Sequence, residues 1–348
     1  MEILETLTAL RDRVLADLQD CPYPSVRADA VIPLLARCPR SGSTPLVESV
    51  DLRDSAGVSS FYVKDERSRM GMGSFKALGA AYVIARDAEA GEARGRTYVT
   101  ASAGNHGLSV AAGAQAFGAE AIIYLSETVP ESFADKLRCF GAEVRREGAF
   151  YEASMAAAST AAAQNGWALL SDSSWADYYD RPLVLMEGYT VLMEEVVAEI
   201  PQPPTHIFLQ AGVGGLAAAC AAYARFAWGE APQITVVEPI AAPALFGSMK
   251  AGAARFTDGP VSAMGRLDCK EPSLIALKGL ARDANHFVLI SEQEGQHGAE
   301  ACAAAGLPST PSGAAGVSGA LAVAAREGGP NMPADARILT ILSEGPDV

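Results

Sequence analysis

A lysine at the start of a predicted helix is the first residue in this chain whose position suggests chemistry. In the stretch GMGSFKALGAAYVIA (71–85), Lys76 follows Ser74, a good N-cap residue, and the apolar residues after it indicate a helix. A cation in the first turn lies at the positive end of the helix dipole, which costs up to about 1 kcal/mol. Lys76 therefore either extends to solvent along its methylene chain or is a neutral, reactive amine.

A glycine-rich turn further along the chain could bind a phosphate. HIFLQAGVGGLAAAC (206–220) has the order of a strand, a turn and a helix start, and N–H groups at such a turn bind anions. The residues of this turn are Gly212, Val213, Gly214, Gly215 and Leu216. They also satisfy G-x-G-x-x-G/A, and Glu238 lies about where a dinucleotide-binding fold places its ribose-binding acid. A dinucleotide-dependent dehydrogenase is therefore an alternative, weakened by the extra Gly215 and by the lack of an obvious hydride-transfer partner.

Two further sites follow predicted strands. The loop ASAGNHG (101–107) contains Ser102 and Asn105 where a helix begins, so its side chains and N–H groups could hold a carboxylate, or could simply cap the helix. Ser343 follows the last predicted strand, at the edge where open α/β sheets bind ligands. The charged run 64–67 is expected to form a solvated or structural ion-pair edge.

The elements that must position these residues alternate along the chain. Short β-branched runs, separated by Ala-rich stretches suited to crossover helices, predict an α/β fold with mostly parallel sheets and helices on both faces. The N-terminal 18 residues are expected to form an amphipathic helix. The predicted strands cover 59–65, 97–101, 121–125, 142–147, 206–211, 233–239, 286–291 and 337–343.

Composition narrows the class of function. The 348 residues carry a net charge of −14, which disfavours nucleic acid and anionic membranes as partners. No apolar run has the length of a membrane-spanning helix. Four histidines without HxxxH or HExxH spacing make a zinc site unlikely on sequence grounds, so no metal is predicted. Six scattered cysteines fit reduced thiols in the cytoplasm.

Taken in order, the motifs S-F-K, S-x-G-N-H-G, G-V-G-G-L and a C-terminal Ser-x-Gly are more specific than any one of them. They resemble the fold type II (tryptophan-synthase-β-like) family of pyridoxal-phosphate enzymes, and the chain is most similar to the diaminopropionate ammonia-lyases within it. The likeness extends over nearly the whole chain, including the segments VKDERSRMGMGSFKALGAAY, LSDSSWADYYDRPLVLMEGYT, MGRLDCKEPS and ILSEG.

This resemblance implies two three-layer α/β/α domains with pyridoxal 5'-phosphate (PLP) in the cleft between them. Residues 1–75 plus 190–348 would form the large, cofactor-binding domain, and residues 76–189 the small, mobile one. Lys76 would bind the cofactor covalently and remove the substrate's α-proton. Gly212–Leu216 would hold the cofactor phosphate, Asn105 the phenolic oxygen of the ring, and Ser343 the pyridine nitrogen. The residues implied for the substrate are Ser102, Ala103, Asn105, His106 and Asp172, the last pairing with a β-ammonium group.

The reaction that the resemblance implies is α,β-elimination on a small β-substituted L-amino acid, with L-2,3-diaminopropionate, converted to pyruvate and ammonia, as the best candidate. Alanine at 103 cannot move a proton, whereas relatives that accept both enantiomers carry aspartate there, so L-specificity is expected. Threonine dehydratases also carry alanine, and a dehydratase acting on L-serine, threonine or 3-hydroxyaspartate is the alternative. A β-replacement synthase and a ligand-sensing module are further hypotheses. The family further implies a homodimer.

Overall fold

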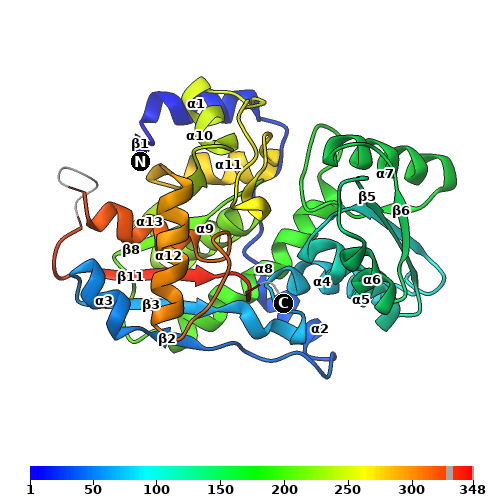
Figure 1. The fold of residues 1–348 in the computed structure, drawn as a ribbon, viewed down its shortest axis with the longest axis horizontal. Helices are drawn as coiled ribbons and strands as arrows, with labels where there is room; N and C mark the ends of the chain where they lie inside the picture. The colour runs from blue at the N-terminus through cyan, green and yellow to red at the C-terminus, as the bar shows by residue number, and fades with distance from the viewer. Residues whose placement is uncertain (327–331, 347–348) are drawn as a thin grey trace.

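Two β-sheets organise the computed structural model of the protein, which describes residues 1–326 and 332–346. Figure 1 shows them side by side, each flanked by helices. The larger sheet has the strand order β1 (Glu2–Glu5), β10 (His286–Ile290), β9 (Gln233–Pro239), β8 (His206–Gln210), β11 (Arg337–Leu342), β3 (Ser60–Asp65) and β2 (Leu46–Glu48). The smaller sheet has the order β6 (Glu143–Arg146), β5 (Glu120–Leu125), β4 (Thr97–Ala101) and β7 (Ala168–Leu169).

Most neighbouring strands run parallel, as the sequence predicts. Only the two edge strands of the larger sheet, β1 and β2, pair antiparallel among the described residues. Parallel strands need crossover connections, and the helices that supply them cover both faces of a sheet. The central strand β8 is accordingly buried at all five positions, which explains why HIFLQ lacks alternation of polar and apolar residues.

Helices supply the outer layers of both halves. Those around the larger sheet are α1 (Thr8–Asp17), α3 (Val50–Ala56), α9 (Gly215–Trp228), α10 (Ala244–Ala251), α11 (Leu274–Asp283), α12 (Glu292–Ala304) and α13 (Ala315–Ala324). Those around the smaller sheet, or between the two, are α2 (Ala28–Leu35), α4 (Lys76–Glu89), α5 (Asn105–Ala116), α6 (Glu131–Cys139), α7 (Tyr151–Asn165) and α8 (Asp180–Glu199). Two short 3₁₀ turns are η1 (Glu66–Gly71) and η2 (Gly265–Leu267).

All eight predicted strands are confirmed to within one residue at each end. The prediction for the N-terminus is wrong in part, because residues Glu2–Glu5 pair with β10 and the helix starts only at Thr8. A four-residue edge strand is shorter than a sequence pattern can distinguish from a helix start. Strands β2 and β7, of three and two residues, were not predicted for the same reason.

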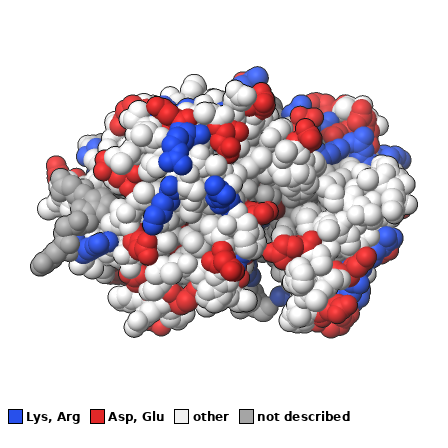
Figure 2. All heavy atoms as spheres, turned by 90° about the horizontal axis from the view of Figure 1, so that it is seen from above, with Lys and Arg blue, Asp and Glu red and all other residues white. Residues whose placement is uncertain are grey.

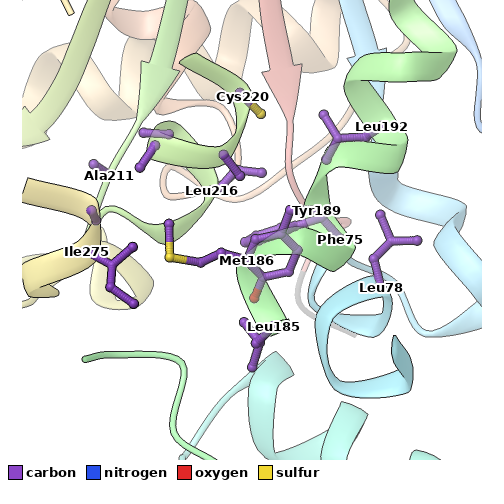
Figure 3. Close-up of a cluster of buried hydrophobic side chains, with 14 of the residues drawn as sticks. Phe75, Leu78, Leu185, Met186, Tyr189, Leu192, Ala211, Leu216, Cys220 and Ile275 are labelled. Carbon is purple, nitrogen blue, oxygen red and sulfur yellow. The ribbon is translucent and has the colours of Figure 1, made fainter. Parts of the chain in front are cut away.

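Helices α4 and α8 meet at a seam of two glycines. A Cβ at Gly79 of α4 would lie 2.7 Å from Cε1 of Tyr189, and one at Gly188 of α8 would lie 2.8 Å from the Leu78 carbonyl oxygen. The ring of Tyr189 packs edge-to-face on Phe75, with 4.9 Å between the ring centroids. Figure 3 shows this aromatic pair within an apolar cluster formed by α4, α8, α9 and α11. The seam therefore fixes the helix that begins at Lys76 against α8.

Within the described ranges, no helix is both long and apolar enough to cross a membrane. Acidic and basic side chains are interspersed over the face seen in Figure 2, which has a recess between its two lobes.

Candidate active site

Lys76 and Asp172 form an ion pair between the two sheets. Lys76 is the first residue of α4, and its Nζ lies 2.5 Å from Oδ2 of Asp172, which follows β7. Burial opposes the charge on Lys76, but the Asp172 carboxylate outweighs burial and raises the pKa of the amine. Burial likewise opposes the charge on Asp172, yet Lys76 lowers the pKa of its carboxyl group. In this arrangement a counter-ion 96 residues away in the sequence compensates the charge of Lys76, and its role as a reactive amine stays a prediction.

The segment before Lys76 is held by the C-terminal strand. Phe75 donates its N–H to the carbonyl oxygen of Ser343 at 3.2 Å, and Ser74 forms an isolated antiparallel bridge with Glu344. Ser74, the predicted N-cap, accepts the backbone N–H of Lys76 on its Oγ at 3.4 Å, and Phe75 lies between it and the first residue of α4. Ser343, the predicted partner of the pyridine nitrogen, therefore lies beside the segment that carries Lys76.

The predicted phosphate loop lies next to the same pair. Residues 212–214 lie between β8 and α9, and Gly215 and Leu216 begin α9, whose first N–H groups have no carbonyl partner within the helix. Gly214 has φ = 98°, a conformation that favours glycine, and a Cβ there would lie 2.9 Å from Leu245. The Cβ position of Gly215 lies 3.7 Å from the carbonyl oxygen of Asp172. The structure thus brings the phosphate loop, Asp172 and Lys76 together.

The loop 102–107 offers donors at the N-terminus of α5. Ser102 Oγ accepts N–H groups from Gly104 (3.3 Å) and Gly107 (3.0 Å), so the hydrogen of its hydroxyl can donate to a ligand. A Cβ at Gly107 would lie 2.8 Å from the Ser102 carbonyl oxygen, which shows why this tight loop needs glycine. Ala103 lines a cavity of about 580 Å³ together with Thr128, Phe133, Lys136 and Arg266.

His106 is buried, and its tautomer follows from one contact. Its Nε2 lies 2.8 Å from the carbonyl oxygen of Leu170, which can only accept, so Nε2 carries the hydrogen. Burial lowers the pKa of His106, so the ring is neutral and Nδ1 is an acceptor. Nδ1 has no hydrogen-bond partner among the described residues. The His106 ring therefore cannot donate to a substrate carboxylate, and only its backbone N–H remains for that role.

Asn105 reaches across to the larger sheet through a residue that the sequence did not single out. Its Nδ2 donates to the carboxylate of Glu344, which directly follows Ser343. The only signal for Glu344 was its place next to Ser343 at the carboxyl end of a strand. Tyr189, whose ring lies 5.9 Å from Lys76 Nζ, was missed because an aromatic residue inside a helix looks like core.

The charged run 64–67 is more deeply buried than expected. Lys64, Glu66 and Arg69 are at most 1% exposed, and all three belong to one network with Glu195 of α8. Lys64 Nζ lies 2.6 Å from Glu195, and Arg69 bonds to both glutamates at 2.7 Å. Two positive and two negative side chains balance there. Of the two alternatives expected from the sequence, a structural ion-pair cluster is therefore correct for these residues and a solvated one is wrong.

Glu238 removes the main support for a dinucleotide site. Its two carboxylate oxygens accept the backbone N–H groups of Leu245 (2.8 Å) and Phe246 (2.7 Å), at the start of α10. Burial raises the pKa of Glu238 to about 8, although the two backbone hydrogen bonds oppose that shift. A carboxylate that caps a helix and is fully buried is not available to bind a ribose.

Residues 39–344 match the family model described as pyridoxal-phosphate dependent enzyme. The chain belongs to this family. Among curated relatives, the diaminopropionate ammonia-lyase of Escherichia coli K12 is 32% identical over 270 residues, which cover 70% of this chain and 67% of the relative. The human L-serine dehydratase/L-threonine deaminase is 28% identical over 253 residues, covering 72% and 73%.

Solved structures of pyridoxal-phosphate enzymes agree with this assignment. The crystal structure of E. coli diaminopropionate ammonia-lyase with an aminoacrylate–PLP azomethine reaction intermediate superposes with a TM-score of 0.84 at 26% identity, covering 99% of this chain and 93% of the other. Tomato threonine deaminase isoform 2 has a TM-score of 0.79 at 21% identity, covering 93% and 91%, which supports the fold alone. The family and fold predictions are confirmed.

The side chains present fit pyridoxal phosphate. An amine at Lys76 suits an aldehyde, and N–H groups at the start of α9 suit a phosphate. The loop before α9 is tightly packed, because Cβ atoms at Gly212 and Gly214 would meet neighbours at 2.9 Å. Among the residues that the structure describes, none bonds to Nδ1 of His106, so a hydrogen-bond acceptor is available to a ligand in this region. Across the described ranges, no three His, Cys, Asp or Glu side chains are grouped to hold a metal ion.

Proposed function

We propose that the protein is a PLP-dependent ammonia-lyase that eliminates the β-substituent of a small L-amino acid. The best candidate is L-2,3-diaminopropionate, which with one water gives pyruvate and two ammonia molecules. The observation that carries the proposal is the Asp172 carboxylate, 2.5 Å from Lys76 Nζ. An acid beside the reactive amine suits a substrate with a second ammonium group and would be costly beside an apolar substituent. The relatives named as diaminopropionate ammonia-lyases support it.

The roles proposed for the side chains are those that the family resemblance implies, and their placement supports them. N–H groups of Gly212–Leu216 bind the cofactor phosphate, and Ser343 faces its pyridine nitrogen. Ser102 and the N–H groups at the start of α5 bind the substrate carboxylate. Lys76 takes the α-proton on its Nζ, and Asp172 pairs with the β-ammonium group. The cofactor, when bound, withdraws electrons from Cα.

A dehydratase acting on L-serine, threonine or 3-hydroxyaspartate is the second candidate. Serine dehydratases among the relatives support it. The two candidates differ in stoichiometry, because a diamino substrate yields two ammonia molecules for each pyruvate and a hydroxy amino acid yields one.

Ala103 supports L-specificity. A methyl group beside the substrate loop cannot donate or accept a proton, so no acid or base is supplied at this position. Equal rates with D- and L-2,3-diaminopropionate would contradict this part of the proposal.

The test begins with absorption spectroscopy of the purified protein with PLP. We expect a visible band that borohydride bleaches, with the reduced label on Lys76 after peptide mapping. Ammonia and pyruvate are then counted with L-2,3-diaminopropionate and with L-serine. A protein that stays colourless with added PLP would sink the proposal. Turnover of L-serine, at one ammonia per pyruvate, without turnover of the diamino substrate would move it to the dehydratase.

The domain division, the oligomeric state and the cellular compartment complete the proposal. The division into residues 1–75 plus 190–348 and 76–189 is supported by the two separate sheets, and the small domain is proposed to close over the substrate. A homodimer follows the family resemblance, and light scattering would measure it. The cytoplasm suits six free cysteines.

A further inference from the structure

The carboxylate of Glu344 has no role in the proposed reaction, yet it is only 4% exposed and makes contacts on both of its oxygens. Oε2 accepts from Asn105 Nδ2 and forms an ion pair with Arg266 Nε at 2.9 Å. Oε1 accepts the hydroxyl of Thr310. Hydrogen bonds to an ionised carboxylate are about twice as strong as neutral ones, so this group can fix the orientation of its partners.

Glu344 is itself held firmly through its backbone. Its carbonyl oxygen accepts the hydroxyl of Ser309 at 2.6 Å, and the N–H of Gly345 donates to the Gly73 carbonyl oxygen at 3.0 Å. The residue also bridges to Ser74, two positions before Lys76. The carboxylate therefore projects from a backbone that is tied to the segment carrying the reactive amine.

The partners of the carboxylate belong to two different parts of the molecule. Arg266 and Thr310 lie in segments around the larger sheet, and Arg266 supplies the positive charge that a buried carboxylate needs. Asn105 is the first residue of α5, which packs on β4 and β5 of the smaller sheet. The bond from Asn105 to Glu344 thus crosses between the two sheets.

We propose that Glu344 is a positioning residue that fixes the amide of Asn105 and holds the N-terminus of α5 against the larger sheet. Only the NH₂ group of an asparagine can donate to a carboxylate, so this contact sets which way the amide faces. One hydrogen of Nδ2 is used by Glu344, and the second stays directed for an acceptor on a ligand. The inference rests on the proposed function, in which that acceptor is the phenolic oxygen of the cofactor.

The consequence for activity passes through the loop 102–107. If the amide of Asn105 turns, the donors at the start of α5 shift relative to Lys76, and misplacement by about 1 Å can reduce a rate up to a hundredfold. Glu344→Gln keeps the shape but loses the charge, and its NH₂ group must face Thr310 for Asn105 to keep an acceptor. Glu344→Ala removes every side-chain contact.

A double-mutant cycle tests whether Glu344 acts through Asn105. We expect Glu344→Ala, which removes the shared hydrogen bond outright, and Asn105→Ala each to lower kcat/KM by roughly tenfold to a hundredfold. Both of these variants, and also Glu344→Gln, should shift the visible band of the holoenzyme. The double variant should be no worse than the poorer single variant, because both remove one shared interaction. Independent, additive losses would overturn the proposal, since a merely structural role of Glu344 would add to the loss of Asn105.

The matched control is Asp87→Asn. Asp87 is a partly buried carboxylate that, like Glu344, has three partners, Arg96 (2.7 Å), Tyr98 (2.7 Å) and Arg181 (3.1 Å). It lies near the C-terminal end of α4, away from Lys76. We expect this variant to leave the visible band and kcat/KM unchanged. A band shift equal to that of Glu344→Gln would show that the loss of any such charge is enough, and would contradict a specific role for Glu344.

Hydrogen exchange measures the same contact without the cofactor. In the protein without PLP, amides at the start of α5 should exchange at least tenfold faster in Glu344→Ala than in wild type, with Thr310→Val intermediate because it keeps the charge. Unchanged exchange in both variants would overturn the proposal. Because this readout needs no cofactor, it separates failure of the Glu344 contact from failure of the proposed function, which the absorption spectrum of the wild type reports.

Discussion

The stretch 64–76 carries residues of two ion-pair clusters, each with acidic and basic side chains, and the two clusters are built differently. At its beginning, Lys64, Glu66 and Arg69 bond to one another or to Glu195, and Arg69 also donates to the Gly42 carbonyl oxygen and the Thr44 hydroxyl. At its end, Lys76 has one acidic partner among the described residues, Asp172. The first cluster uses most of its donors and acceptors within the protein.

The second cluster leaves donors and acceptors in reserve. The Lys76 and Asp172 side chains are 22% and 19% exposed, and the His106 Nδ1 near them has no partner among the described residues. A saturated network stabilises one conformation, whereas a pair with spare capacity can exchange its partner for a ligand. The comparison teaches that burial of charge alone does not mark a functional site: the candidate site here is the ion pair that keeps unused hydrogen-bonding groups beside it.

Removing the amine should give the largest effect. Lys76→Met is expected to abolish the borohydride-sensitive band and to lower turnover by about 10⁴-fold or more, as for loss of an essential nucleophile. The variant should stay folded, because Asp172 keeps access to water. Kinetics and denaturant unfolding measure the two effects. Substantial turnover without Lys76 would contradict the assignment of the Lys76–Asp172 pair as the functional cluster.

Breaking the saturated network should affect stability instead. Arg69→Met leaves the fully buried Glu66 without its cation, so we expect the free energy of unfolding to fall by about 3–5 kcal/mol. Urea unfolding measures this loss. Arg138→Met, which removes an exposed ion pair with Glu131, is the control and should change little. If Arg69→Met were as stable as the control, the network would not be structural.

Neutralising Asp172 sharpens the comparison at the site. Since Asp172 raises the pKa of Lys76, Asp172→Asn should lower that pKa and leave more neutral amine at pH 7. PLP should then attach faster at neutral pH, and the rate should reach its plateau at a lower pH than in wild type. Turnover of L-2,3-diaminopropionate should fall about tenfold more than turnover of L-serine. Stopped-flow absorbance and steady-state kinetics measure these changes, and slower attachment at pH 7 would contradict the pairing.

The smallest expected effect concerns Glu238, a buried carboxyl group outside both clusters. Its pKa is raised from 4.5 to about 8 in the folded protein, so its contribution to stability is complete below pH 4.5 and is lost as the pH rises through 8. Glu238→Gln should therefore gain stability relative to wild type between pH 5.5 and 8.5. Urea unfolding at both values measures the difference, and a gap that does not change with pH would rule out this titration.

Sequence alone predicted the residues whose role depends on local backbone. Gly212–Leu216 and the loop 102–107 lie at helix starts, where a short motif is enough to predict an anion site. Asn105 and Glu344 are 239 residues apart, and Arg69 and Glu195 are 126 apart, so no local pattern links them. The raised pKa of Lys76 and the tautomer of His106 could not be predicted from the sequence for the same reason. Each depends on one atom supplied by the segment 170–172.

The two-glycine seam between α4 and α8 determines the position of the helix that carries the reactive amine. Where two backbones touch, added volume cannot be absorbed by a side chain that rotates away. A single methyl group at Gly79 would meet Tyr189 at 2.7 Å and Leu185 at 2.8 Å, so α4 would have to move. Because α4 begins with Lys76, Gly79→Ala would act as a spacer that displaces the amine from its partner while every polar atom of the site keeps its identity.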